Sequence, residues 1–156
     1  MIGYKIITPP ETIITHVHTT LTDPIYHHPA PVTVAGEGDY GPCRLCLNTF
    51  SLGERRILFL YNPFSIQQDA DFAGPIFIHA DRCLPYTTPQ LFPEPIRCLP
   101  ITVRGYNAHN HFISEERPHS LNVEIAIEAL LRRPDIAFIH VRNIEAKCFI
   151  LRMERT

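Results

Sequence analysis

The sequence has few of the features that mark membrane proteins and nucleic-acid-binding proteins. No window approaches the run of about 20 apolar residues that a membrane-spanning helix needs. Lys and Arg number 14 against 16 Asp and Glu, a formal net charge of -2, and no basic stripe runs along the chain. Phosphate backbones and anionic lipids therefore have no general attraction for this protein. We expect neither a nucleic-acid partner nor a membrane.

Glycine is scarce, and the local motifs of several enzyme classes are missing. The chain has 7 glycines against 15 prolines, with no Gly-rich phosphate loop, no G-x-S-x-G elbow and no zinc-protease helix motif. The N-terminal stretch 1–10 has one lysine and only a short apolar run, which is not the pattern of a secretory signal. We therefore expect a cytoplasmic protein whose 5 cysteines, an odd number, stay reduced.

Length and composition are those of one globular domain. The chain has 156 residues, of which 45% are hydrophobic and 19% charged, enough to bury a core. We predict a single domain over 1–156, with a loosely organised N-terminal part at 1–40 and a core at 41–156. Within the first part, 22–40 is rich in Pro, Gly, His and Asp and indicates an extended loop. If residues around His16 form a strand, His16 and His18 lie on the same face of it, because side chains alternate between the two faces.

The rest of the chain predicts an α+β fold. Compact apolar runs indicate strands at 56–61 and 75–79. The pattern of 101–106, a turn at 107–110 and 111–114 indicates a hairpin. Two further apolar stretches, 136–142 and 148–154, predict a C-terminal β-hairpin.

One segment, 121–133, has the signals of a helix. Its apolar residues recur at helical spacing, Ser120 can serve as the N-cap, and Pro134 ends it. A helix between groups of strands favours a mostly antiparallel β-sheet with this one main helix packed on it.

Cysteine and histidine form the strongest chemical pattern. Cys43 and Cys46 have the C-x2-C spacing that places two thiolates on one metal ion, and His79 and Cys83 follow at H-x3-C spacing. Zinc accepts a Cys3His set, at about 2.3 Å for sulfur and about 2.0 Å for nitrogen. If Ala80 to Cys83 begins a short helix, the order of elements is similar to the treble-clef arrangement of many zinc modules.

Other interpretations of the same four residues remain open. Free cysteine often packs as a small buried hydrophobe, so the set can be ordinary core. A C-x2-C pair can also serve thiol redox chemistry, although such pairs normally open a helix after a strand. Four protein ligands would close a zinc site, and a closed site is structural rather than catalytic.

A second candidate lies in the C-terminal hairpin. If Arg142 pairs with Cys148, then His140 pairs with Ile150, and His140 and Cys148 become diagonal neighbours about 7 Å apart. A Cys–His pair can activate a thiolate nucleophile, although no third group that would orient the histidine is identifiable.

Several short stretches after Tyr40 carry a family resemblance. They are Gly41 to Arg44, Gly53-Glu54, Tyr61 to Phe64, Gly74 to His79, Arg104 to Asn107, and most specifically Pro134 to Asn143 with Cys148-Phe149. Together they resemble the bacterial "domain of unknown function 1203" (DUF1203) family. The resemblance implies a small stand-alone bacterial protein and no particular activity.

The family pattern bears on both candidate sites. It implies that many relatives lack a cysteine at the place of Cys46, so a zinc site would belong to one branch of the family. It also draws attention to His140, Asn143 and Cys148 as matching positions without giving them roles.

The sequence therefore favours a small zinc-stabilised, non-catalytic binding or structural module, with Cys43, Cys46, His79 and Cys83 as ligands and a protein as the expected kind of partner. The alternative is a thiol-dependent small-molecule enzyme that uses Cys148 with His140, and Asn143 is a further candidate for its site.

Overall fold

The computed structural model describes residues 2–156, which form two compact units. We call residues 2–7 with 88–156 the five-stranded unit, and residues 8–87 the three-stranded unit. All the strand pairs in the described part of the chain are antiparallel, and helices are few, so the predicted α+β class is confirmed. That 1–156 behaves as a single domain stays a prediction.

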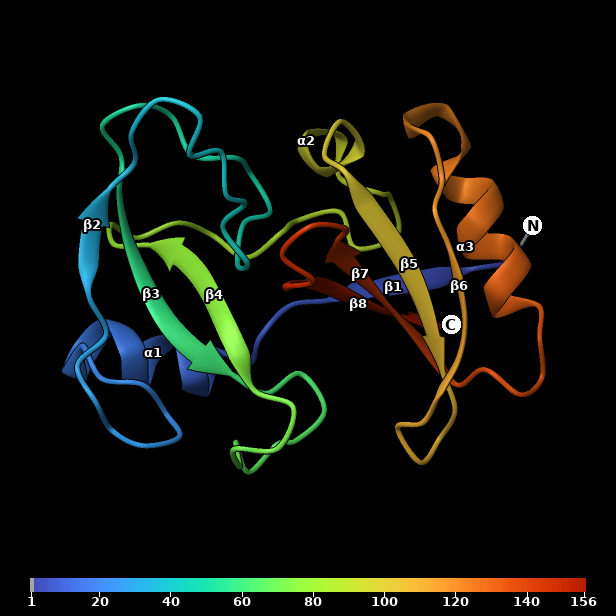
Figure 1. The fold of residues 1–156 in the computed structure, drawn as a ribbon, viewed down its shortest axis with the longest axis horizontal. Helices are drawn as coiled ribbons and strands as arrows, with labels where there is room; N and C mark the ends of the chain where they lie inside the picture. The colour runs from blue at the N-terminus through green and yellow to red at the C-terminus, as the bar shows by residue number, and fades with distance from the viewer. Residues whose placement is uncertain (1) are drawn as a thin grey trace. The chain divides into compact units, whose positions relative to one another are not determined.

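The five-stranded unit is built on one sheet with strand order β1-β8-β7-β5-β6 (Figure 1). Its strands are β1 (Tyr4–Ile7), β5 (Ile101–Tyr106), β6 (Phe112–Glu116), β7 (Phe138–Asn143) and β8 (Phe149–Arg155). Its helical segments are α2 (Glu94–Arg97), the 3-10 turn η1 (Ser120–Asn122) and α3 (Val123–Leu131). The predicted hairpin around residues 107–110 is confirmed as β5 and β6.

Helix α3 packs against β5 and β7 and supplies much of the core of this unit. Its buried residues are Val123, Ala126, Ile127, Leu130 and Leu131, the face that the helical spacing predicted. The helix is shorter than predicted because residues 120–122 form η1. The predicted cap is wrong: Asn122, not Ser120, precedes α3, and no side chain caps it.

The C-terminal hairpin forms as predicted: β7 and β8 correspond to the strands expected at 136–142 and 148–154. Its register differs from the predicted one. Arg142 lies opposite Phe149, and His140 lies opposite Arg152, with an irregularity between Val141 and Arg142. The pairing is offset by one residue already at Arg142, and the irregularity adds one more, so the predicted pairing of His140 with Ile150 is wrong.

The three-stranded unit contains a sheet of order β2-β3-β4, with β2 (Val32–Val34), β3 (Arg55–Tyr61) and β4 (Gly74–His79). Strands β3 and β4 confirm the strands predicted at 56–61 and 75–79. Arg56 lies opposite His79 in this hairpin, so the residue at the end of β4 lies beside the start of β3.

A helix that the sequence did not predict, α1 (Glu11–Thr20), precedes this sheet. His16 and His18 lie on it, so their expected placement on a strand is wrong. The β-branched residues of this segment favour a strand locally, but Ile14 and Val17, three positions apart, are the ones that become buried. Burial at helical spacing overrides local propensity here.

Across residues 2–156, the helices are all too short or too polar to cross a membrane.

Candidate metal centre

Cys43 and Cys46 lie on one tight turn before β3. Residues 44–46 form the turn, and two backbone hydrogen bonds hold it: Leu47 N donates to Cys43 O at 2.9 Å and Cys43 N donates to Asn48 O at 2.9 Å. Leu47 adopts a left-handed φ of 62°, which is uncommon for a leucine, and its side chain is fully buried. Burial of Leu47 offsets the backbone strain and keeps the turn in one conformation.

The other two residues of the cluster come from β4 and the segment after it. His79 is the last residue of β4, and Cys83 lies four residues later in a stretch that forms neither helix nor strand. The predicted helix start at Ala80 to Cys83 is therefore wrong, and the treble-clef arrangement lacks that helix. The Cys3His convergence does not depend on it.

Three hydrogen bonds hold β4 in place at the cluster. Arg44 N donates to Phe77 O at 3.0 Å, and His79 N donates to Cys43 Sγ at 3.3 Å. From α1, His18 Nε2 donates to His79 O at 2.9 Å. The turn, the strand and the helix thus fix the backbone on both sides of His79.

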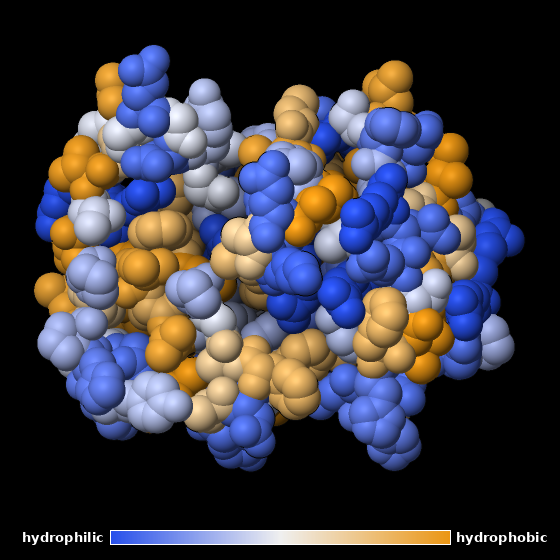
Figure 2. All heavy atoms as spheres, viewed as in Figure 1, coloured by the Kyte–Doolittle hydropathy of each residue, from blue (hydrophilic) through white to orange (hydrophobic). Residues whose placement is uncertain are grey.

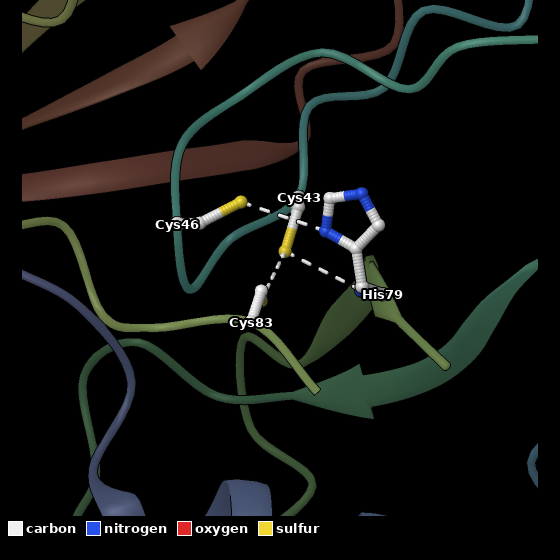
Figure 3. A group of neighbouring side chains, drawn as sticks. All are labelled: Cys43, Cys46, His79 and Cys83. Atoms are coloured by element: carbon white, nitrogen blue, oxygen red, sulfur yellow. Dashed lines mark hydrogen bonds between the residues drawn. The ribbon is translucent and has the colours of Figure 1, made fainter. Parts of the chain in front are cut away.

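The four side chains point toward one another (Figure 3). Their ligand atoms all lie within 4.8 Å of one another. Cys43 Sγ lies 3.8 Å from Cys83 Sγ, and Cys46 Sγ lies 3.5 Å from His79 Nδ1. A tetrahedron with zinc–sulfur bonds of about 2.3 Å and a zinc–nitrogen bond of about 2.05 Å has edges of roughly 3.8 Å and 3.5 Å. The group can hold a metal ion, and these two separations fit zinc.

The second ring nitrogen of His79 contacts a carboxylate. His79 Nε2 lies 2.8 Å from Glu54 Oε2, while Ser51 N donates to Glu54 Oε1 at 2.7 Å. Hydrogen bonding from the Ser51 backbone, and then the charge of His79, lower the pKa of Glu54. Metal-bound histidines in proteins usually donate their other N–H to such a carboxylate, which fixes the tautomer and the ring orientation.

The electrostatics of the thiols also favour a cation. Hydrogen bonds from Cys46 and then Cys83 hold the pKa of Cys43 far below its usual range. The same contacts with Cys43 raise the pKa of Cys46 and the pKa of Cys83. Three thiolates this close repel one another, so on their own they do not all ionise. A bound dication offsets that repulsion and deprotonates the thiols that coordinate it.

The cluster opens on one side into a pocket of about 490 Å³. Cys46, His79 and Cys83 line it, together with Glu54 and Arg82, among others. Cys43 is fully buried and is not among the lining residues. The ligand set is thus complete in protein atoms and still accessible from one direction.

The other predicted site residues, Cys148, His140 and Asn143, lie in the five-stranded unit. Arg142 Nη2 donates to His140 Nδ1 at 3.1 Å, and Cys148 Sγ donates to Ala146 O at 3.7 Å. Asn143 Oδ1 accepts from the backbone N–H groups of Glu145 and Ala146 at 2.9 Å, so this side chain shapes the turn between β7 and β8. The diagonal placement on which the Cys148–His140 hypothesis rested is wrong, since its register is wrong.

His140 lies instead in a group of aromatic rings. Its ring centroid is 4.9 Å from that of Tyr106, 4.9 Å from that of Phe149 and 5.3 Å from that of Phe138. Burial, and then the charges of Arg142, Arg152 and Arg104, hold the pKa of His140 well below its ordinary value of 6.5. A histidine in this environment is neutral at pH 7 and a weak base.

Sequence reasoning missed two residues that support the cluster, Glu54 and His18. Glu54 has a partial signal, because it immediately precedes β3, whose second residue lies opposite His79. His18 has none, because its role depends on α1, which the sequence did not predict.

The fold and the cluster define a small α+β protein with a Cys3His group suited to a metal ion. The chain matches the family described as "Protein of unknown function (DUF1203)" over residues 41–155 and belongs to that family. All four residues of the cluster lie within the matched range. Comparison with curated proteins gave no match, and comparison with solved structures gave none.

Proposed function

We propose that this protein is a zinc-stabilised, non-catalytic binding or structural module whose metal ligands are Cys43, Cys46, His79 and Cys83. The observation that carries the proposal is the convergence of four ligand atoms within 4.8 Å from two segments far apart in the sequence. Buried cysteines that pack only as hydrophobes have no reason to share one centre with the nitrogen of a histidine whose other nitrogen meets a carboxylate.

A structural role suits this ligand set better than a catalytic one. A catalytic zinc keeps one position open for water or substrate, whereas four protein ligands complete a tetrahedron. The ion would join the turn at residues 43–46 to the end of β4 and to the segment that follows it. Because such a site does not exist in the unfolded chain, its binding free energy becomes folding free energy.

Exposed apolar side chains are compatible with the binding part of the proposal. In the three-stranded unit, Leu52, Ile66, Phe72 and Leu84 are all at least three-quarters exposed, at 77%, 88%, 79% and 75%. Figure 2 shows apolar residues interspersed with polar ones on the visible face. Such residues are common singly on protein surfaces, and a continuous patch of them marks a surface that contacts another protein. A formal charge of -2 gives no comparable support for a nucleic-acid partner.

We also propose a cytoplasmic location, as for a bacterial protein of this family. A reducing compartment keeps three neighbouring thiols available as metal ligands.

The test is the zinc content of the natively purified protein, measured by plasma mass spectrometry without chelators, together with thermal unfolding. We expect about one zinc per chain, as a single closed site requires. Cys46→Ser should lose the metal and lower Tm by on the order of 10 °C, because the zinc binding free energy no longer supports the folded state.

Cys98→Ser is the matched control, because Cys98 is an exposed cysteine outside the cluster. It should keep both the zinc and the Tm of the parent protein. Metal-free protein, or a Cys46→Ser variant that retains its zinc, would overturn the proposed site.

A further inference from the structure

The three thiols of the cluster differ in how solvent reaches them. Cys46 and Cys83 line the open pocket, whereas Cys43 is fully buried behind them. A small solute can therefore contact Cys83 while the protein stays folded. Cys43 cannot be attacked first, but it lies directly beside the thiol that can.

The separation of Cys43 and Cys83 suits a covalent bond between them. Their sulfur atoms are 3.8 Å apart, and a disulfide bond requires about 2.05 Å. Cys83 lies in a segment without helix or strand, so a small backbone shift there disrupts no ladder of hydrogen bonds. Cys46 also contacts Cys43, but it lies on the turn that the backbone hydrogen bonds of Cys43 with Leu47 and Asn48 hold in one conformation.

We propose that the cluster is a peroxide-sensitive metal switch, in which a small hydroperoxide entering the pocket oxidises Cys83 and Cys43 then closes a Cys43–Cys83 disulfide that expels the metal. This inference rests on the proposed metal site. It adds a modification site, Cys83, and a chemical class of reactant, hydrogen peroxide or a small alkyl hydroperoxide.

The chemistry balances in two steps. The Cys83 thiolate attacks the O–O bond of hydrogen peroxide, forms a sulfenic acid and releases hydroxide, which takes a proton from solvent to give water. The Cys43 thiolate then attacks the Cys83 sulfur, forms the S–S bond and displaces a second hydroxide, which is also protonated to water. Two thiolates lose two electrons in total, and one peroxide is reduced to two waters.

The disulfide removes half of the ligand set. Only Cys46 and His79 remain, and two ligands do not form a closed zinc site. The segment around Cys83 would then be tied to the turn at Cys43 by a covalent bond in place of the metal. Reduction of the disulfide by a dithiol restores both thiols, so the change is reversible.

The experiment uses the 156-residue chain in a Cys98→Ser background, which removes the exposed cysteine outside the cluster. Zinc content is measured first. Hydrogen peroxide is then titrated in while a chromogenic chelator reports released zinc, and peptide mapping locates the disulfide. We expect about one zinc released per peroxide consumed, a Cys43–Cys83 bond, and rebinding of zinc after dithiothreitol treatment.

A Cys83→His variant separates metal binding from oxidation. Zinc also accepts a Cys2His2 set, so the variant should keep its metal, and it should release that metal on the order of tenfold more slowly under the same peroxide. If the variant binds no zinc, mapping the disulfide in the parent protein still decides the question.

The failures are distinguishable. Protein that contains no zinc before peroxide is added overturns the metal site, and the switch with it. Zinc-loaded protein that keeps its metal, or that loses it while Cys43 bonds to Cys46 or no disulfide forms, overturns the switch alone.

Discussion

Glu54 and His79 meet through Oε2 and Nε2 at 2.8 Å, on the opposite edge of the imidazole from the nitrogen that faces the thiols. His79 Nδ1 faces the thiols and lies 3.5 Å from Cys46 Sγ, so the two ring nitrogens contact different groups. The carboxylate orients the ring and favours the tautomer that leaves Nδ1 free to bind a metal. Glu54 is thus a positioning residue for the cluster.

Removal of this carboxylate should weaken zinc binding without abolishing it. We expect Glu54→Ala to lower zinc affinity about 10- to 100-fold, the usual cost of losing such a partner. Glu54→Gln should lose less, because its side-chain carbonyl can still accept the Nε2–H. Competition with a chelator of known affinity measures both variants.

Asp81→Asn is the control, because Asp81 also lines the pocket but pairs with Arg55 at 3.4 Å instead of contacting His79. Its zinc affinity should match that of the parent. An equal loss in Asp81→Asn and Glu54→Ala would mean that general negative charge, not orientation of His79, supports the metal.

His140 should make stability depend on pH. Burial and then the neighbouring arginines keep its pKa in the folded protein below 6.5, so below that pH the unfolded state binds a proton that the folded state does not. Its contribution to stability is therefore complete above pH 6.5 and is lost as the pH falls toward the folded-state pKa. We expect the free energy of unfolding to fall by at most about 1.4 kcal/mol per pH unit in this window.

Denaturant unfolding at several pH values between about 5 and 7.5, a range that brackets an ordinary histidine pKa, measures this slope. The slope should shrink in His140→Gln and stay unchanged in His109→Gln, since His109 lies exposed on the turn between β5 and β6. Metal loss at low pH affects all three proteins, so it cancels from the comparison. Equal slopes in the two variants would show that His140 is not the group responsible.

Gly105 should tolerate no side chain. It lies in β5, and a Cβ atom added there would clash with Cδ1 of Ile136, which is fully buried. Because the core around Ile136 is closely packed, we expect Gly105→Ala to cost about 1–3 kcal/mol. Thermal or denaturant unfolding measures the loss.

Two further variants test the cause. Ile136→Val removes the clashing methyl group, so the double variant should be less destabilised than the sum of the two single variants. Gly74→Ala is the control, because an added Cβ there meets no atom within 4 Å. Simple additivity in the double variant would rule out the clash with Ile136.

Local sequence patterns predicted most of the regular structure that the core stabilises. The apolar runs at 56–61 and 75–79 form β3 and β4, and the spaced apolar residues after Ser120 form α3. In these segments local preference and burial favour the same conformation, so a pattern read along the chain is sufficient.

Segments in which local preference and burial disagree were not predictable. Helix α1 is rich in β-branched residues, which favour a strand. Burial of Ile14 and Val17, at helical spacing, favours the helix instead. The register of β7 and β8 depends on an irregularity at Val141 and Arg142 that alternation does not reveal. The first error hid the contact of His18 with His79, and the second moved His140 away from Cys148, its expected partner.

By itself the sequence determined the two pairs of metal-ligand residues, Cys43 with Cys46 and His79 with Cys83. Each pair lies within one short segment, so its spacing along the chain limits how far apart the two side chains can be. Tertiary structure alone decided that the pairs meet, because the antiparallel pairing of β3 with β4 returns His79 to the region where the Cys43 turn leads into β3. The same register places Glu54 against His79. Contacts between residues distant in sequence arise from strand pairing and packing, which no local spacing encodes.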